Sequence, residues 1–377
     1  MRIKGDKMRI KWIEFENLET GLKIERIDFF EDVTLLVGLS GVGKTQILNA
    51  VSYSLALAMR HIVLRPYSAT LGIDINGEIY EWSYKIEANP NDDIIVENGY
   101  EYIITNEKLI KNGNMVFERD TNSVNVAGYN SVPQPKKDES LLLQYSDDDE
   151  FEPLISGLRK LYSIERELEV RGGIKSESFN TLKTRVNNSI KKNENVDFRS
   201  FSHLPVMLKI YIAKRHYPEL YIKIFDAVKE LFMEVEGFDV EEDVAREMYL
   251  LCMTVYGKKL MQHDISNGML KTIYYIVELF TMSENSLVMI DEFENGLGVN
   301  CIDLLSEFLL TERKDLQFII TSHHPKIINY IPKEKWKIIE RNIGTVTNAN
   351  CNEYGIGNSQ HDAYFNLINR WEFEGKI

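Results

Sequence analysis

The sequence predicts an α/β fold in which a core of alternating strands and helices is interrupted by an antiparallel β-subdomain and by a helical insertion. Three observations support this prediction. Apolar strands alternate with helices near both ends of the chain, short strands bounded by turns occupy residues 69–125, and apolar residues recur with helical spacing from about residue 150. We therefore divide the 377 residues into segments 8–150, 151–262 and 263–377.

The first segment begins with two predicted strands, Ile10–Phe15 and Val33–Val37. The second strand is a continuous apolar run, which is typical of a buried parallel strand. A Gly-rich turn and a predicted helix over Lys44–Met59 follow it. Between residues 69 and 125 the turns include Asn76-Gly77, which lies between two alternating runs and is a strong hairpin signal. An antiparallel sheet is therefore expected in this region.

The second segment has the apolar spacing of helices. One run extends from Phe151 to Tyr162 and another from Tyr221 to Val235, so helices are expected from about residue 150 to residue 262. The third segment returns to alternation. It is predicted to contain, in order, a helix (Met269–Thr281), a strand (Leu287–Ile290), a helix (Asn300–Leu310) and two strands (Phe318–Thr321 and Trp336–Ile339).

Composition restricts the classes of function. The chain has 44 Lys and Arg against 58 Asp and Glu, a formal net charge of −14, so its surface as a whole does not attract nucleic acid. Residues 183–216 are a local exception with eight bases and two acids, which could contact DNA, contact an acidic partner or form a solvated helical face. No apolar run reaches the ~18 residues of a membrane helix. The N-terminal residues lack the apolar core of a signal peptide, so a cytoplasmic location is expected.

Residues 38–45 read GLSGVGKT and fit the phosphate-binding pattern G-x-x-x-x-G-K-[ST] between a predicted strand and a predicted helix. The glycines let the backbone curl so that successive N–H groups face phosphate oxygens, and the helix N-terminus adds positive potential. Lys44 is expected to reach the β- and γ-phosphates, and the Thr45 hydroxyl is expected to bind Mg²⁺. The nucleotide-binding residues predicted here are Gly38, Ser40, Gly41, Gly43, Lys44, Thr45 and Gln46.

An acid pair, Asp291 and Glu292, follows the apolar strand Leu287–Ile290. Such a pair at a strand end is often only a helix cap. Together with the phosphate loop, however, it indicates catalysis. Asp291 at the tip of the strand is expected to hold the metal ion through a water molecule, and Glu292 is expected to take a proton from the attacking water.

Two further element ends carry candidate residues. His323 follows the strand Phe318–Thr321, where a histidine can contact the γ-phosphate and Glu292, and we prefer it to His324 for this role. Ser266 and Gly268 open a predicted helix, and they would be a plain capping turn if they stood alone. Beside the other motifs, they predict a second phosphate site at a helix N-terminus. In the predicted fold this site does not reach Lys44 of the same molecule, so it would serve the ATP of a partner subunit.

The ordered motifs resemble those of the ABC-type ATPases. They are Walker A at Gly38–Thr45, a signature at Ser266–Lys271, Walker B at Leu287–Glu292, a D-loop at Asn295–Gly298 and a switch histidine at His323. In detail, the stretches SGVGKTQIL, DEFENGLG and TSHHPKIIN are similar to the SMC- and OLD-related bacterial ATPases of the AAA family that are found in anti-phage defence systems. The resemblance implies a P-loop NTPase core of ABC-ATPase type with an antiparallel β-subdomain and a helical lid insertion.

The sequence departs from these families at several points. Asn267 stands where the ABC signature usually has Gly, and Gly298 stands where the D-loop commonly has Asp. Only about 50 residues follow His324, so we expect no Toprim nuclease domain, and the long coiled-coil arms of SMC proteins are not predicted. Gln144 is the candidate for the Q-loop residue that contacts the magnesium ion; its alternative is a surface glutamine.

The resemblance implies hydrolysis of ATP to ADP and phosphate with Mg²⁺, in a homodimer or higher homo-oligomer that shares its ATP sites between subunits. We interpret the chain as a nucleotide-driven switch, the sensor or regulator subunit of an anti-phage system that controls a separately encoded effector, plausibly a nuclease. Three alternatives stay open: an SMC-like ATPase of DNA repair or recombination, an ABC transporter subunit, and a scaffold that binds ATP without hydrolysing it.

Overall fold

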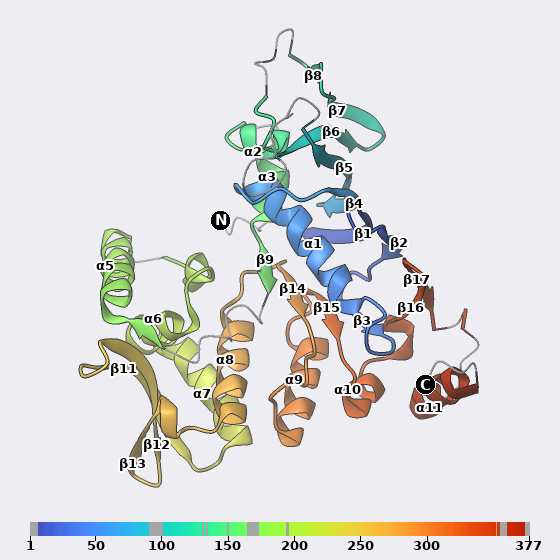
Figure 1. Cartoon of the computed structure of the whole chain (residues 1–377). Coiled ribbons are helices and arrows are strands. Elements are labelled where there is room, and N and C mark those ends of the chain that lie inside the picture. The colour runs from blue at the N-terminus through green and yellow to red at the C-terminus, as the bar shows by residue number, and fades with distance from the viewer. Residues whose placement is uncertain are drawn as a thin grey trace. The chain divides into compact units, whose positions relative to one another are not determined.

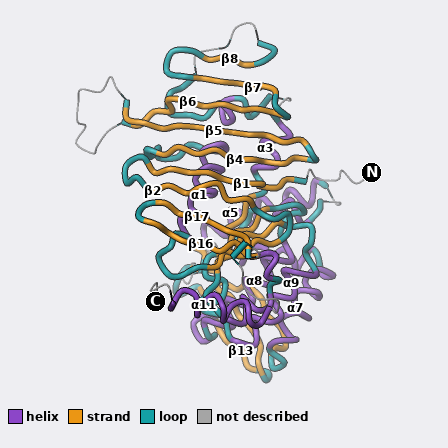
Figure 2. The backbone as a smooth tube through the Cα atoms, turned by 90° about the vertical axis from the view of Figure 1, so that its right-hand side faces the viewer, coloured by secondary structure: helices purple, strands orange, loops and turns teal. Residues whose placement is uncertain are grey.

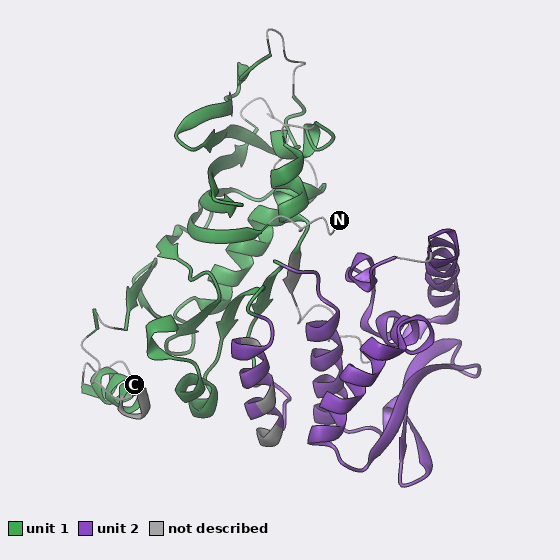
Figure 3. Cartoon of the chain, turned by 180° about the vertical axis from the view of Figure 1, so that it is seen from behind, with its two compact units in different colours: residues 1–162, 285–293, 314–377 green, residues 163–284, 294–313 purple. Residues whose placement is uncertain are grey.

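A computed structural model of the chain describes residues 7–89, 101–129, 132, 135–148, 151–163, 173–193, 196–351, 353–354 and 360–373. The chain forms two compact units, shown in two colours in Figure 3. Unit 1 comprises residues 1–162, 285–293 and 314–377, and unit 2 comprises residues 163–284 and 294–313. Within the described residues, no helix combines the length and the apolar character needed to span a membrane.

Unit 1 is built on one large mixed sheet. Figure 2 shows many of its strands lying side by side. The order of the described strands is β8-β7-β6-β5-β4-β1-β2-β17-β16-β3-β15-β14-β9. Their bounds are β1 Met8–Asn17, β2 Leu22–Asp28, β3 Val33–Val37, β4 Tyr67–Ile75, β5 Glu78–Ala88, β6 Tyr102–Lys111, β7 Asn114–Arg119, β8 Val124–Val126, β9 Leu161–Ser163, β14 Leu287–Ile290, β15 Gln317–Thr321, β16 Trp336–Asn342 and β17 Thr345–Asn350.

The centre of this sheet is parallel. Strand β3 pairs with β15 on one side and with β16 on the other, and β15 pairs in turn with β14. Strands β3, β14 and β15 are buried along their whole length, as expected for strands covered on both faces. The strands predicted over Val33–Val37 and Leu287–Ile290 are confirmed residue for residue. Because these strands run in the same direction, the segments that follow them meet at one edge of the sheet.

The antiparallel part of the sheet confirms the expectation for residues 69–125. Strands β4 to β8 form a meander in which each strand pairs with the next. Asn76 and Gly77, which join β4 to β5, both have a positive φ, 55° and 90°. A two-residue turn of this kind requires positive φ at both positions, and Asn-Gly supplies it with little strain.

Helices of unit 1 pack on the sheet (Figure 1). The predicted helix Lys44–Met59 is confirmed as α1, and its apolar side chains join those of the sheet in one buried core. Two short helices follow the β-meander in the chain, two more lie between β15 and β16, and a longer helix follows β17. The remaining described helices of unit 1 are α2 Leu141–Gln144, α3 Glu152–Leu158, α10 Pro325–Tyr330, η3 Lys333–Lys335 and α11 Gln360–Phe373.

A buried ion pair lies inside the β-meander, and its carboxylate also binds the start of α2. The Arg119 guanidinium lies 2.9 Å from the Glu107 carboxylate, and both side chains are almost fully buried. Glu107 also accepts hydrogen bonds from the Trp82 indole, the Ser140 hydroxyl and the Leu141 amide. Burial lowers the pKa of Arg119, and the charge of Glu107 opposes this shift. A buried charge of this kind is tolerated only while its partners remain in place.

We expect Arg119→Met to lower the free energy of unfolding of unit 1 by about 3–5 kcal/mol, because it leaves the Glu107 carboxylate buried without its counter-ion. All four tryptophans lie in unit 1, so urea unfolding followed by tryptophan fluorescence measures this unit alone. The matched control is Lys108→Met, which removes a solvent-exposed pair with Glu118 and should cost less than about 1 kcal/mol. Equal losses in the two variants would contradict the prediction.

Unit 2 contains helices and a small antiparallel sheet. The described helices are α5 Ser176–Lys192, η1 Phe198–Phe201, α6 Val206–His216, α7 Pro218–Leu231, η2 Gln262–Asp264, α8 Asn267–Thr281 and α9 Val299–Thr311. The sheet consists of β10 Ile174–Lys175, β11 Val235–Asp243, β12 Met248–Val255 and β13 Lys258–Met261. The helices predicted over Met269–Thr281 and Asn300–Leu310 are therefore confirmed within two residues at each end.

The prediction of helix through residue 262 is wrong in its last part. Helix α7 ends at Leu231, and Val235 is the first residue of β11 rather than the last apolar position of a helix. Strands β11 and β12 pair with a register shift between Val235 and Gly237, and Val235, Phe238 and Val240 are buried. The bulge interrupts the alternation of buried and exposed side chains along the strand. The apolar residues of β11 therefore lack the spacing by which a strand is recognised in a sequence.

Four of the eight basic residues in the stretch 183–216 pair with acids within unit 2. Lys209 forms a buried pair with Glu278 at 2.6 Å. Lys214 and Arg215 both contact Asp239, and Arg199 contacts Glu284. Three basic residues on α5 are exposed and have no acidic partner among the described residues; they are Arg185, Lys191 and Lys192. A continuous basic surface across the whole stretch is therefore absent from the described part of unit 2.

Candidate functional site

The predicted phosphate loop lies between β3 and α1 in unit 1. Gly41 and Gly43 have φ values of 81° and 112°, which side chains other than glycine rarely adopt. At Gly38, a Cβ atom would lie 2.5 Å from the carbonyl oxygen of Ile339. These contacts explain the three glycines, because the loop must curl tightly while it packs against β16. Helix α1 begins directly after the loop and has no acidic residue in its first turn, so its N-terminus keeps a positive potential.

Lys44 is folded back over this loop. Its ammonium group donates hydrogen bonds of 2.8 Å to the carbonyl oxygens of Gly38 and Leu39, and only 6% of the residue is exposed. Gln46, in the first turn of α1, has a buried Oε1 atom that would lie 3.1 Å from a Cβ atom at Gly43. The structure thus places Lys44 inside the loop and Gln46 against its last glycine.

Thr45 and Asp291 are 246 residues apart in the sequence and meet at the carboxyl edge of the sheet. The Thr45 hydroxyl donates a hydrogen bond of 2.6 Å to the Asp291 carboxylate. A hydroxyl beside a carboxylate is the donor set expected for Mg²⁺, which prefers oxygen ligands and retains several waters. Among the described residues, no three His, Cys, Asp or Glu side chains gather into a metal-binding group. The residues therefore fit a magnesium ion that is shared with phosphate oxygens, and they do not fit a closed protein cage.

Glu292 follows Asp291 in an unusual backbone conformation. Its side chain is exposed, and its φ of 46° is a left-handed value that costs about 1–3 kcal/mol in a residue other than glycine. Its amide donates a hydrogen bond of 2.7 Å to the Thr321 hydroxyl. The same hydroxyl donates to Asp291 at 2.5 Å. Thr321 thus belongs to the site, although its position in the sequence indicates only the last residue of a strand.

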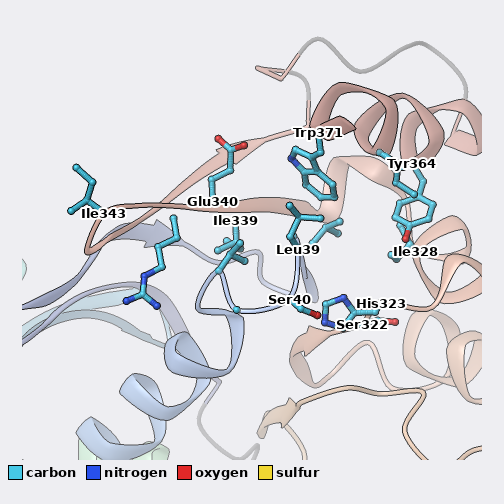
Figure 4. Close-up of a pocket in the computed structure, with 16 residues that line it drawn as sticks. Leu39, Ser40, Ser322, His323, Ile328, Ile339, Glu340, Ile343, Tyr364 and Trp371 are labelled. Carbon is cyan, nitrogen blue, oxygen red and sulfur yellow. The ribbon is translucent and has the colours of Figure 1, made fainter. Parts of the chain in front are cut away.

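His323 lies beside the phosphate loop. It lines, together with Ser40, a cavity of about 790 Å³ that is bounded on another side by Tyr364 and Trp371 of α11. Figure 4 shows the Ser40 and His323 side chains next to each other. His324 is engaged differently, because its Nδ1 accepts a hydrogen bond from the Lys326 amide and caps α10.

The predicted signature and D-loop lie together in unit 2. Ser266 is the N-cap of α8, where its hydroxyl accepts a hydrogen bond from the Met269 amide at 3.3 Å. A Cβ atom at Gly268 would lie 3.3 Å from the Gly296 carbonyl oxygen, and the Lys271 ammonium group donates to the Asn295 carbonyl. The N-terminus of α8 and the turn 295–298 therefore support each other.

Gln144 is not brought to the Thr45–Asp291 pair. Its amide donates to the Glu139 carbonyl at 3.1 Å, and the Glu139 carboxylate lies 3.4 Å from His61, just beyond the C-terminal end of α1. Thr45 stands at the opposite end of this helix, whose 16 residues span about 24 Å. The structure therefore offers no contact between Gln144 and an ion at Thr45, and we withdraw Gln144 as a ligand. The sequence order of Gln144 suggested a Q-loop, but the fold places it at the wrong end of α1.

A large mixed sheet whose glycine-rich loop meets an acid pair at its carboxyl edge defines a P-loop ATPase fold, and this confirms the predicted fold class. The chain belongs to the family described as "AAA domain, putative AbiEii toxin, Type IV TA system", which matches residues 117–329.

A curated relative is the chromosome partition protein Smc of Methanocaldococcus jannaschii, which is 23% identical over 203 residues. These residues are 52% of this chain and 17% of the relative, so the chain matches only a small part of that protein.

Similar solved structures include an SMC head domain from Thermotoga maritima, with a TM-score of 0.47 and 12% identity over 91% of this chain and 98% of the other. Another is an Smc head bound to the C-winged helix domain of ScpA. Its TM-score is 0.48 at 12% identity, and the match covers 92% of this chain and 99% of the other. A third, from Pyrococcus furiosus, is an Smc head domain with an extended coiled coil bound to the C-terminal domain of ScpA. Its TM-score is 0.44 at 14% identity, and the match covers 92% of this chain and 98% of the other.

Proposed function

We propose that this chain binds and hydrolyses ATP with Mg²⁺ and uses the nucleotide as a conformational switch. The observation that carries the proposal is the hydrogen bond of 2.6 Å between Thr45 and Asp291, which joins the phosphate loop to the acid pair. A threonine hydroxyl and an aspartate carboxylate placed in this way are the protein ligands expected for a nucleotide-bound magnesium ion.

Each residue of the site has a distinct part in the proposed reaction. The loop amides and the N-terminus of α1 bind phosphate oxygens, and Lys44 neutralises their charge when it leaves the loop carbonyls. Glu292, exposed beside Asp291, orients a water molecule and accepts its proton. His323, beside Ser40, contacts the γ-phosphate and so distinguishes ATP from ADP. Thr45 and Asp291 would hold a Mg²⁺ ion, which would neutralise negative charge on the phosphate groups.

We infer that two copies of the chain share each nucleotide. Ser266 and Gly268 present a helix N-terminus with a small hydroxyl residue and a glycine, which is suited to phosphate oxygens. In the proposed dimer they face the ATP held by the loop of the partner subunit. ATP favours the closed dimer and hydrolysis releases it, so the nucleotide biases a two-state equilibrium.

The proposed output is control of a separately encoded effector, a nuclease, in the cytoplasm during anti-phage defence. The resemblance of the motifs supports this role, and the family description names a putative toxin of a toxin–antitoxin system. The alternative is an SMC-like ATPase of DNA repair or recombination. It predicts hydrolysis stimulated by DNA ends. The net charge of −14 and the pairing of half of the bases in the stretch 183–216 with acids favour the first reading.

The first test is ATP turnover by the purified chain. We expect phosphate release that requires Mg²⁺ and falls to background in EDTA, because Thr45 and Asp291 are suited to a magnesium-bound nucleotide. Phosphate release is measured with and without duplex DNA ends. Stimulation by DNA would favour the repair alternative, and no magnesium-dependent turnover under any condition would refute the enzymatic proposal.

A further inference from the structure

Thr321 is a buried residue at the end of β15, two residues before His323, and its hydroxyl contacts the acid pair. We propose that its hydroxyl is a positioning group: it fixes the orientation of the Asp291 carboxylate toward the metal site and holds the backbone of Glu292. This inference rests on the proposed magnesium and water-activating roles of those two acids. It adds a residue to which the ATP-binding motifs assign no task.

The sheet order explains why residue 321 occupies this place. Strand β15 lies between β3, which leads into the phosphate loop, and β14, which leads into Asp291. Ile320 is the partner of Ile290, the last residue of β14, so Thr321 stands level with Asp291. A side chain at the end of β15 therefore lies between the two halves of the site.

The Thr321 hydroxyl uses both of its hydrogen-bonding roles at this position. It donates its hydrogen to Oδ1 of Asp291 at 2.5 Å and accepts the Glu292 N–H at 2.7 Å. The other oxygen of Asp291, Oδ2, receives the Thr45 hydroxyl. The two carboxylate oxygens thus have different partners, and Oδ2 is the one turned toward the proposed metal ligand Thr45.

The backbone of Thr321 strengthens this arrangement. Its carbonyl oxygen accepts the Phe293 N–H at 3.0 Å, so one residue holds two consecutive amides of the turn after β14. Glu292 keeps its left-handed φ of 46° between these bonds, and Phe293 is fully buried. Because Thr321 is itself buried, water does not readily replace its hydroxyl. The direction of the exposed Glu292 side chain therefore depends on Thr321.

The test compares Thr321→Val, which removes the hydroxyl but keeps the shape, with Thr321→Ser, which restores it. The matched control is Thr34→Val on the neighbouring strand β3, where a fully buried hydroxyl accepts the Phe30 amide away from the acid pair. Two readouts are used for each variant: kcat and KM for ATP, and the Mg²⁺ concentration needed to bind a fluorescent, non-hydrolysable ATP analogue.

For Thr321→Val we expect kcat to fall about 10–100-fold and the Mg²⁺ requirement to rise about tenfold, as is usual when a group that orients a metal ligand is lost. Binding of the analogue in EDTA should change less than about twofold, because the phosphate loop is intact, and Thr321→Ser should stay within about threefold of the wild type in every readout. Thermal unfolding of the variants shows whether they are folded.

Two results would overturn the role of Thr321. One is a Thr321→Val protein with an unchanged Mg²⁺ requirement. The other is equal loss in Thr321→Val and Thr34→Val, which would indicate a structural hydroxyl only. If the wild type binds the analogue with Mg²⁺ but does not turn over ATP, the proposed hydrolysis fails while the binding readout still decides the role of Thr321. If the wild type binds no magnesium-nucleotide, both proposals are refuted.

Discussion

Replacement of Glu292 by Gln is expected to lower ATP turnover by about 10²–10⁴-fold, which is the usual contribution of a general base. The substitution keeps the size of the side chain and removes the group that accepts the proton of the attacking water. The backbone bonds that hold residue 292, from its amide and that of Phe293 to Thr321, do not involve the side chain and should persist. Binding of ATP and Mg²⁺ should therefore be retained.

A trapped state should accompany this loss. Because the Glu292→Gln protein binds ATP without hydrolysing it, the closed dimer should accumulate in ATP and Mg²⁺ and dissociate in EDTA. Single-turnover phosphate release and size-exclusion chromatography with light scattering measure the two effects. The matched control is Glu14→Gln, which makes the same charge change at an exposed position of β1. Wild-type turnover in the Glu292→Gln protein would show that another group activates the water. If the wild-type protein and Glu292→Gln both bind ATP without turnover, the chain only binds ATP.

Two inactive variants are expected to restore turnover when they are mixed. Lys44→Ala removes the charge from the phosphate loop, and Ser266→Asp places a carboxylate where the partner's phosphate would lie. Each protein alone should turn over ATP at background. In a mixed dimer, one of the two sites combines an intact Lys44 with an intact Ser266. Random pairing of equal amounts therefore restores about a quarter of the wild-type sites.

The Ser266→Asp substitution is chosen because it should abolish ATP turnover without lowering the stability of the protein. Ser266 caps α8, and loss of a cap costs about 0.5–2 kcal/mol, but Asp is as good a cap as Ser and also suits the helix dipole. The variant should therefore unfold at the wild-type temperature. The control mixture combines Lys44→Ala with Lys44→Ala Ser266→Asp, in which no site is intact. If the first mixture stays at background although both proteins fold and associate, each chain completes its own pocket and the shared site is disproved.

Much of the fold could be predicted from local patterns. The buried run Val33–Val37 and the helix Lys44–Met59 follow directly from apolar spacing and from the glycines between them. The Asn76-Gly77 turn follows from the positive φ that both residues tolerate. The prediction fails over β11, where a bulge breaks the period of two and leaves apolar residues at spacings that also suit a helix.

Some residues of the candidate site can be predicted from the sequence, and others cannot. Thr45 and Asp291 were recognised separately because each lies in a motif with its own chemistry, and the structure brings them within hydrogen-bonding distance. Gln144 was misplaced because a glutamine has no local signal that shows where its helix packs. Thr321 was overlooked because a threonine at the end of a strand is common, and its two partners are known only once β15 is placed between β3 and β14.

The sequence alone determined the elements and the residue types of a phosphate site, since glycine conformation, helix capping and strand burial act over a few neighbouring residues. Only the tertiary structure decided which distant groups face one another: the Asp291 carboxylate between Thr45 and Thr321, the Glu107 pair inside the meander, and Gln144 at the far end of α1. The reason is physical. Hydrogen bonds and ion pairs form at distances of about 3 Å. Residues that are distant in the sequence reach such distances only after the strands have paired in their final order.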